Sequence, residues 1–350
     1  MEPLILLLCI AILLVLIVWS CEVFVNAIEH LGKFYNIGDG AVGSIFAAVG
    51  TALPETIVPL VAIFGAYFSG SNLKVGNEIG MGAILGSPFL LSTLAMFVTG
   101  VAVLVAFGLK KREKDINIDI CFLHRDLRFF VIAYTVAVLA SFIPFKPLKI
   151  VIGLSLFVFY LVYATRTIKK CCNGTCLPEE EEEKQELHIS KLIKLNNDYK
   201  IHLIWVQVTV SILFLVVFSH FFVENIKIVA ERLHIAPLII SLLLAPVATE
   251  LPEMFNSITW VFKTKDTLAL SNITGAMVFQ SCIPMTIGII FTTWQFNSSA
   301  IINIILVYCS ILVIFLTTLN KEKKLTSLNL IYCGLFYFAY IAYILFYVIK

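Results

Sequence analysis

The feature that most constrains this chain is the recurrence of apolar runs long enough to cross a membrane. Stretches such as 89–108 and 203–223 hold almost no charge. A helix of about 20 residues spans a hydrocarbon core of about 30 Å, and it satisfies its backbone amides within the segment. The composition agrees, because 60% of the 350 residues are hydrophobic and 14% are charged, against about 25% charged in soluble domains. We therefore expect an all-α membrane protein.

Ten transmembrane helices are predicted, divided into two sets of five. The expected spans are 4–31, 38–68, 75–108, 128–144, 148–165, 201–232, 236–262, 267–294, 300–318 and 326–348. The long polar stretch 166–200, which holds the run Glu179–Glu183, separates the fifth span from the sixth. The predicted organisation is a first five-helix repeat over 1–165, a linker loop over 166–200 and a second five-helix repeat over 201–350.

The basic residues predict the orientation of these spans. With the N-terminus outside, 19 of the 25 lysines and arginines fall in the inside segments, as the positive-inside rule requires. Both termini are then outside and the 166–200 loop is cytoplasmic, in a multi-pass protein of the cell membrane. Because five is odd, the two halves enter the membrane in opposite directions, which is the inverted-repeat architecture of many transporters.

Both halves carry the same local pattern in their second span. It reads Gly-Thr-Ala-Leu-Pro-Glu over 50–55 and Ala-Thr-Glu-Leu-Pro-Glu over 248–253. A proline inside a helix removes one backbone hydrogen bond and kinks or breaks the helix. The threonine lies four residues before the last glutamate of each motif, so both side chains share one helix face.

A glutamate buried in lipid costs at least about 2.5 kcal/mol, so it usually faces a cavity, a partner or an ion. Carboxylate and hydroxyl oxygens are the ligands of hard cations such as Ca²⁺ and Na⁺. The two motifs therefore predict one shared cation chamber. The competing interpretation is that both glutamates are protonated or paired in a packed bundle, which the repetition disfavours. The expected ligands are Thr51, Glu55, Thr249 and Glu253.

These motifs resemble the α-repeats of the calcium/cation antiporter superfamily, the sodium/calcium exchangers, whose form is Gly-Thr-Ser-Leu-Pro-Glu. The stretches 245–257 and 271–280 are similar to a prokaryotic branch. The resemblance implies ten helices in two inverted halves and exchange of Ca²⁺ for Na⁺ or another cation by alternating access. It also implies that Glu55 and Glu253 are the central ligands, that the first and sixth spans are the moving gate, and that no cofactor is needed.

The chain departs from this pattern at several positions. The family's serine after the threonine is Ala52 in the first half and Glu250 in the second. The third span normally carries a Gly-Ser-Asn motif with an amide or acid four residues past the serine, and in the second half that last position is Gln280. In the first half the register stays open between 86–88, which includes Ser87, and 80–82. Ser87, Glu250 and Gln280 complete the candidate ligands.

The departures leave the counter-ion open. Glu55, Glu250 and Glu253 can offer a charge of up to −3, although Glu250 is expected to point partly away from the site. Crowded carboxylates repel one another when all are ionised, so a shared proton would let H⁺ replace Na⁺.

Three other classes of protein fit less well. A channel usually builds its pore from one motif per subunit, whereas this chain carries both motifs, so we expect a monomer to suffice. An intramembrane enzyme would need paired aspartates or a Ser/His pair, which we do not find. A pure scaffold would not need the repeated motif. No basic patch with interleaved aromatics suggests a nucleic-acid partner. The expected partners are inorganic cations and the lipid bilayer.

Overall fold

A computed structural model describes residues 3–34, 53–68, 70, 72–113, 115–170, 200–319 and 325–348. In these ranges the elements are helical, and the one β-type pairing is an isolated bridge between Asp115 and Thr326. The elements are α1 (Pro3–Phe34), α4 (Leu53–Phe68), α5 (Leu73–Leu90), η2 (Leu91–Ala95), α6 (Met96–Gly108), α7 (Ile120–Leu139), η3 (Ala140–Phe142), α8 (Lys146–Lys170), α10 (Lys200–Leu233), α11 (Pro237–Thr249), α12 (Leu251–Phe262), α13 (Asp266–Phe291), α14 (Ser298–Leu319), α15 (Ser327–Tyr343) and η6 (Ile344–Val348).

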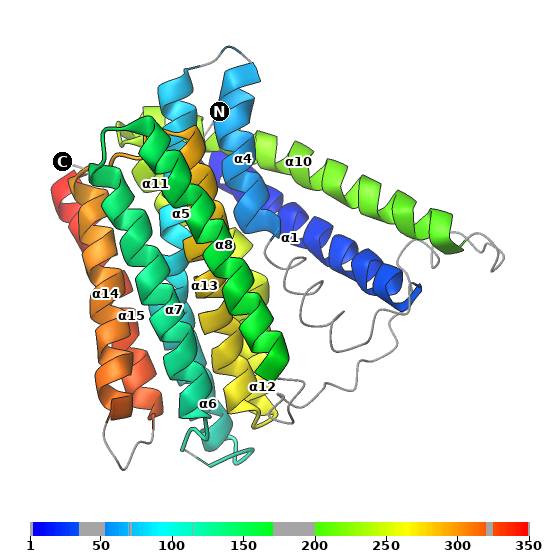
Figure 1. Cartoon of the computed structure of the whole chain (residues 1–350), viewed down its shortest axis with the longest axis vertical. Helices are drawn as coiled ribbons and strands as arrows, with labels where there is room; N and C mark the ends of the chain where they lie inside the picture. Colours follow the sequence, from blue (N-terminus) through cyan, green and yellow to red (C-terminus); the bar gives the residue numbers. More distant parts are fainter. Residues whose placement is uncertain are drawn as a thin grey trace.

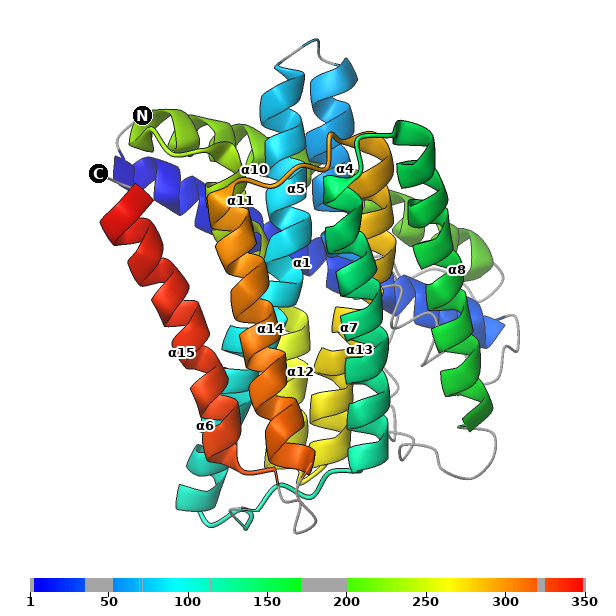
Figure 2. The same ribbon diagram turned by 60° about the vertical axis from the view of Figure 1, so that its left-hand side comes forward.

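Most helices run along one common direction, whereas α1 and α10 lie side by side and cross the others obliquely (Figures 1 and 2). Helices α1 and α10 share a small apolar cluster of their own, made of Phe24, Ala27, Ile204 and Val208. A second, much larger apolar core runs through the bundle and includes other residues of α1 and α10, such as Ile17 and Phe222.

Eight helical runs in the described ranges are long and apolar enough to cross a membrane: Leu8–Ala27, Leu73–Gly108, Lys146–Thr167, Ile201–Leu233, Pro237–Phe262, Asp266–Phe291, Ser298–Leu319 and Ser327–Val348. The multi-pass prediction is therefore confirmed. Helix α4 is apolar but shorter, and α7 carries several charged residues in its first half. The count of ten and the inverted repeat stay predictions, and residues 35–52 and 171–199 lie outside the described ranges.

The predicted start of the fourth span, at residue 128, is wrong. Helix α7 begins at Ile120, where the side chain of Asp119 caps it by accepting a hydrogen bond of 2.8 Å from the Cys121 N–H. A span that starts at residue 128 leaves the charged residues Arg125 and Asp126 outside the helix. The structure instead buries Asp126, which is 1% exposed, inside the bundle.

The carboxylate of Asp126 joins three helices. Arg125, its neighbour on α7, donates two hydrogen bonds of 2.9 and 3.0 Å to one oxygen. The hydroxyl of Tyr163 on α8 donates to the same oxygen at 3.1 Å, and Thr274 on α13 donates to the other at 3.0 Å. A buried charge is tolerated when it is paired and hydrogen-bonded in this way, so this network fixes α13 against α7 and α8.

Helix α5 is the element on which the two halves meet, because every residue from Ile79 to Leu90 is buried. Its glycines allow the backbone of α11 to approach closely. A Cβ atom added at Gly82 would lie 2.2 Å from the carbonyl oxygen of Leu238, and one added at Gly86 would lie 2.2 Å from that of Leu242. Small residues serve the same purpose at many membrane helix crossings.

We predict that Gly86→Ala lowers the stability of the protein by about 1–3 kcal/mol, the usual cost of overpacking a well-packed core. The added methyl group would meet backbone atoms of α11, which cannot move aside as a flexible side chain can. Thermal unfolding in detergent measures the effect. The matched control is Gly65→Ala on α4, where an added Cβ has nothing within 4 Å. Equal melting temperatures for the two variants would contradict the close crossing.

A second prediction concerns the Asp126 network. Asp126→Asn removes the charge that Arg125 needs, and breaking a buried ion pair costs about 3–5 kcal/mol. Tyr163→Phe removes a single hydrogen bond and should cost about 1–2 kcal/mol. The same unfolding experiment tests both changes. If Asp126→Asn were no more damaging than Tyr163→Phe, the ion pair would not be what holds α7 to α13.

Candidate cation site

The two motif glutamates occupy the same local position in the two halves. Helix α4 begins Leu-Pro-Glu and α12 begins Leu-Pro-Glu, so Glu55 and Glu253 both lie in the first turn of a helix. Pro54 and Pro252 stand just before them, where a missing N–H costs nothing because the first turn has no intrahelical partner for it. The motif therefore places each glutamate at a helix start.

In the second half the predicted helix break is confirmed. Helix α11 ends at Thr249, α12 begins at Leu251, and Glu250 is the single residue between them. The Glu250 N–H still donates to the carbonyl oxygen of Pro246 at 2.9 Å, and the Glu250 carbonyl accepts from the Met254 N–H at 3.1 Å. In the first half, the residues before Leu53 lie outside the described ranges, and Thr51 is among them.

The three carboxylates of Glu55, Glu250 and Glu253 come together. One oxygen of each lies within 4.8 Å of the others, and the three residues are 4%, 0% and 2% exposed. The expectation that Glu250 points partly away from the site is therefore wrong. That expectation treated 250–253 as part of one straight helix, whereas α11 ends and α12 begins on either side of Glu250.

Three hydrogen-bond donors surround the carboxylate of Glu250. The amide nitrogen of Gln280 on α13 donates to both oxygens at 2.8 Å. The hydroxyl of Thr249 donates to one oxygen at 3.3 Å, and the hydroxyl of Ser87 on α5 also bonds this carboxylate. The structure thus brings Ser87, Thr249 and Gln280 to the acid cluster through Glu250.

Two buried oxygens at the site accept no hydrogen bond within the described part of the chain: Oε2 of Glu55 and Oε1 of Gln280. Buried polar atoms in proteins almost always have a partner. No described lysine or arginine forms an ion pair with Glu55 or Glu250. Oxygen atoms that are buried, negatively charged as a group and without donors are suited to bind a cation.

Two residues beside the cluster are not among the ligands that the sequence predicts. Asn272 on α13 donates from its amide to the Glu253 carbonyl oxygen at 3.0 Å and to the Ser257 hydroxyl at 3.3 Å, which ties the start of α12 to α13. Cys21 on α1 is 2% exposed and lies near the carboxylates of Glu55 and Glu253. Asn272 stands in the stretch that resembles the exchangers, whereas nothing in the sequence singles out Cys21.

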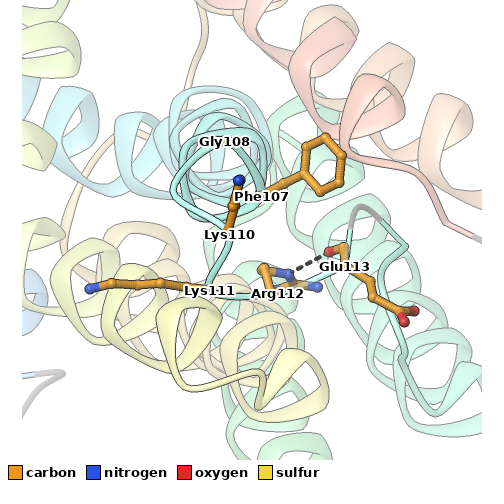
Figure 3. Close-up of a pocket in the computed structure, with 6 residues that line it drawn as sticks. All are labelled: Phe107, Gly108, Lys110, Lys111, Arg112 and Glu113. Atoms are coloured by element: carbon orange, nitrogen blue, oxygen red, sulfur yellow. Dashed lines mark hydrogen bonds between the residues drawn. The ribbon is translucent and has the colours of Figure 1, made fainter.

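A shallow hollow at the far end of α6 is separate from this site. It is lined by Phe107, Gly108, Lys110, Lys111, Arg112 and Glu113 (Figure 3). Arg112 reaches from it to Asp266 at the start of α13, with hydrogen bonds of 2.5 and 2.7 Å. None of the three clustered carboxylates lines this hollow, which is a helix-to-helix junction and not the acid site.

Comparison with known proteins gives the family of the chain. The family model for sodium/calcium exchanger proteins matches residues 5–169 and 203–349. An uncharacterised membrane protein of Methanocaldococcus jannaschii is 21% identical over 283 residues, 79% of each chain. A putative antiporter, CaxA, of Alkalimonas amylolytica is 23% identical over 300 residues, 82% of this chain and 81% of that protein.

Solved structures share the fold. The crystal structure of the H⁺/Ca²⁺ exchanger CAX aligns with a TM-score of 0.71 at 16% identity, covering 98% of this chain and 84% of that one. The sodium-calcium exchanger NCX_Mj aligns with a TM-score of 0.57 at 18% identity, covering 97% and 98%. Because the family model matches nearly the whole length of both halves, this chain belongs to the sodium/calcium exchanger protein family.

Proposed function

We propose that this chain is a secondary active antiporter that carries Ca²⁺ across the cell membrane in exchange for Na⁺. The cluster of Glu55, Glu250 and Glu253 is the observation that carries this proposal. Three ionised carboxylates in an apolar bundle repel one another and lack the hydration that they have in water. Such a site is stable when cations or protons occupy it, which is the property that a cation carrier needs.

The chemistry of the available ligands favours a hard cation. Ca²⁺ takes six to eight oxygen ligands at about 2.3–2.6 Å, from carboxylates, amide oxygens and waters. The site offers the carboxylates of Glu55 and Glu253 and the amide oxygen of Gln280, with hydroxyls beside them. Membership of the sodium/calcium exchanger family supports the same pair of ions.

The counter-ion has two candidates. Na⁺ is the expectation from the family, and H⁺ is the alternative, because a proton can neutralise one of three crowded carboxylates. The relatives with known fold include an H⁺/Ca²⁺ exchanger and a sodium-calcium exchanger. The fold is therefore compatible with either ion, and transport measurements must decide.

Two observations support an inverted repeat of five helices each and ten in all. The family model matches the two halves separately, and α4 and α12 begin with the same three residues at the same cluster. Because both halves contribute to one site, a single chain would suffice for transport, which disfavours a channel built on an oligomer axis. The positions of the termini outside and of the 166–200 loop in the cytoplasm follow from the positive-inside rule.

Alternating access requires a part that moves past the site, and α1 with α10 suits this role. These helices cross the others obliquely (Figure 2) and pack on each other through a small apolar cluster of their own, although other residues of both belong to the main core. The amide of Gln207 on α10 also donates to the Val23 carbonyl oxygen at 2.8 Å and to Asn26 at 3.0 Å, both on α1. We infer that the two helices shift together across the fixed site.

The test is uptake of radioactive calcium into vesicles that hold the purified protein. An outward Na⁺ gradient, an outward H⁺ gradient or no gradient is imposed. We expect Na⁺-driven uptake that falls at least about tenfold in Glu253→Gln and in Glu55→Gln, because each loses a charged ligand worth more than 1.4 kcal/mol. Uptake driven by H⁺ alone would instead identify the proton as the counter-ion.

The matched control is Glu224→Gln on α10. That side chain is 46% exposed and pairs with Lys227 at 2.6 Å, and surface pairs contribute little. Transport by this variant should equal that of the unmodified protein. Calcium uptake that ignores both gradients, or that survives in both site variants, would overturn the proposed function.

A further inference from the structure

The pairing of Gln280 with Glu250 links a helix of the second half to the break between α11 and α12. Both side chains are buried, at 1% and 0% exposure, and the amide nitrogen lies 2.8 Å from each carboxylate oxygen. An ionised carboxylate can only accept hydrogen bonds. The amide of Gln280 presents its NH₂ group to Glu250, which is the orientation that an ionised carboxylate requires.

This orientation has a consequence for the other end of the amide. With the nitrogen on Glu250, Oε1 of Gln280 is turned away from that carboxylate, and it has no partner within the described residues. A buried acceptor of this kind calls for a water, a donor or a cation. The side chain that carries this oxygen reaches Glu250, one member of the cluster of three carboxylates.

The carboxylate of Glu250 differs from the other two in its surroundings. Besides the amide of Gln280, the hydroxyls of Thr249 and Ser87 bond it. Both of its oxygens thus accept hydrogen bonds from the protein, whereas Oε2 of Glu55 accepts none from the part of the chain that the structure describes. Glu250 contributes negative charge to the site while its oxygens are already hydrogen-bonded.

We propose that Glu250 is a positioning residue: it holds the amide of Gln280 so that the amide oxygen, and not the amide nitrogen, is turned toward the transported cation. This proposal rests on the proposed function and assigns different roles to the three carboxylates. Glu55 and Glu253 contact the cation directly. Glu250 adds its charge without contacting the cation, and it orients Gln280 as a neutral oxygen ligand.

The proposal predicts the effect of Glu250→Gln. An amide at position 250 carries its own NH₂ group, so the amide of Gln280 gains a partner for its oxygen and is free to turn over. Its NH₂ group would then face the cation. We expect Ca²⁺ binding to weaken at least about tenfold, the effect of one charge-assisted hydrogen bond.

The exchange of the two groups is the decisive variant. Glu250→Gln combined with Gln280→Glu keeps the total charge and keeps one amide against one carboxylate. If the two single changes acted independently, their effects on the Ca²⁺ affinity would multiply. We expect the double variant to bind Ca²⁺ at least about tenfold more tightly than that product gives. Calorimetric titration of Ca²⁺ into the purified protein in detergent measures all four proteins, with Glu224→Gln as the matched control. Additive effects, within about twofold, would overturn the proposal.

A second measurement separates this proposal from the proposed function. Thermal unfolding of the same proteins in a chelator needs no bound or transported ion. The single changes should each lower the melting temperature, because they place two amides or two carboxylates face to face, and the double variant should recover most of the loss. Recovery in melting temperature without recovery in Ca²⁺ binding would show a structural pair alone, and would overturn the positioning role. If the unmodified protein bound no Ca²⁺ while the melting temperatures were coupled, the proposed function would fail although the pair exists.

Discussion

The mutual repulsion of three carboxylates in an apolar bundle is the constraint to which the rest of this structure responds. Glu55, Glu250 and Glu253 are all but inaccessible to solvent, so water does not stabilise their charges as it would on a surface. The hydrogen bonds that compensate this cost are distributed unequally among the three carboxylates. The protein surrounds Glu250 with donors, whereas within the described ranges one buried oxygen of Glu55 accepts no hydrogen bond, and this asymmetry supports the proposed cation site.

Such a site requires a rigid support, because a displacement of a ligand by about 0.5 Å already degrades a binding geometry. Helix α13, which carries Gln280, is anchored along its length. Its first residue, Asp266, pairs with Arg112. Further along, Thr274 bonds the buried carboxylate of Asp126, and Asn272 holds the start of α12. Helix α13 is thus tied at three points to other elements of the bundle.

Much of this arrangement could be predicted from the sequence. The apolar runs predicted the membrane helices, the proline of the repeated motif predicted a kink or break in that span, and the repetition predicted that Glu55 and Glu253 lie together. Helix periodicity could not predict the direction of Glu250, because α11 and α12 meet at that residue and do not form one straight helix. Nor could it place Asp126 inside the bundle, since its burial depends on Tyr163 and Thr274, which come from distant parts of the chain.

The site and the crossing of α5 with α11 depend on each other. At Gly86 the absence of a side chain lets α5 approach α11, where an added Cβ would meet the ring of Pro246 at 2.5 Å. The carbonyl of Pro246 accepts the hydrogen bond of the Glu250 N–H and so fixes the backbone at the break. Ser87 follows Gly86 directly, so the approach that brings the two backbones together also brings its hydroxyl to the Glu250 carboxylate. The glycine is therefore a packing residue and, through the residue after it, a determinant of the site: a larger side chain at position 86 would separate the helices and withdraw one donor from the carboxylate that orients Gln280.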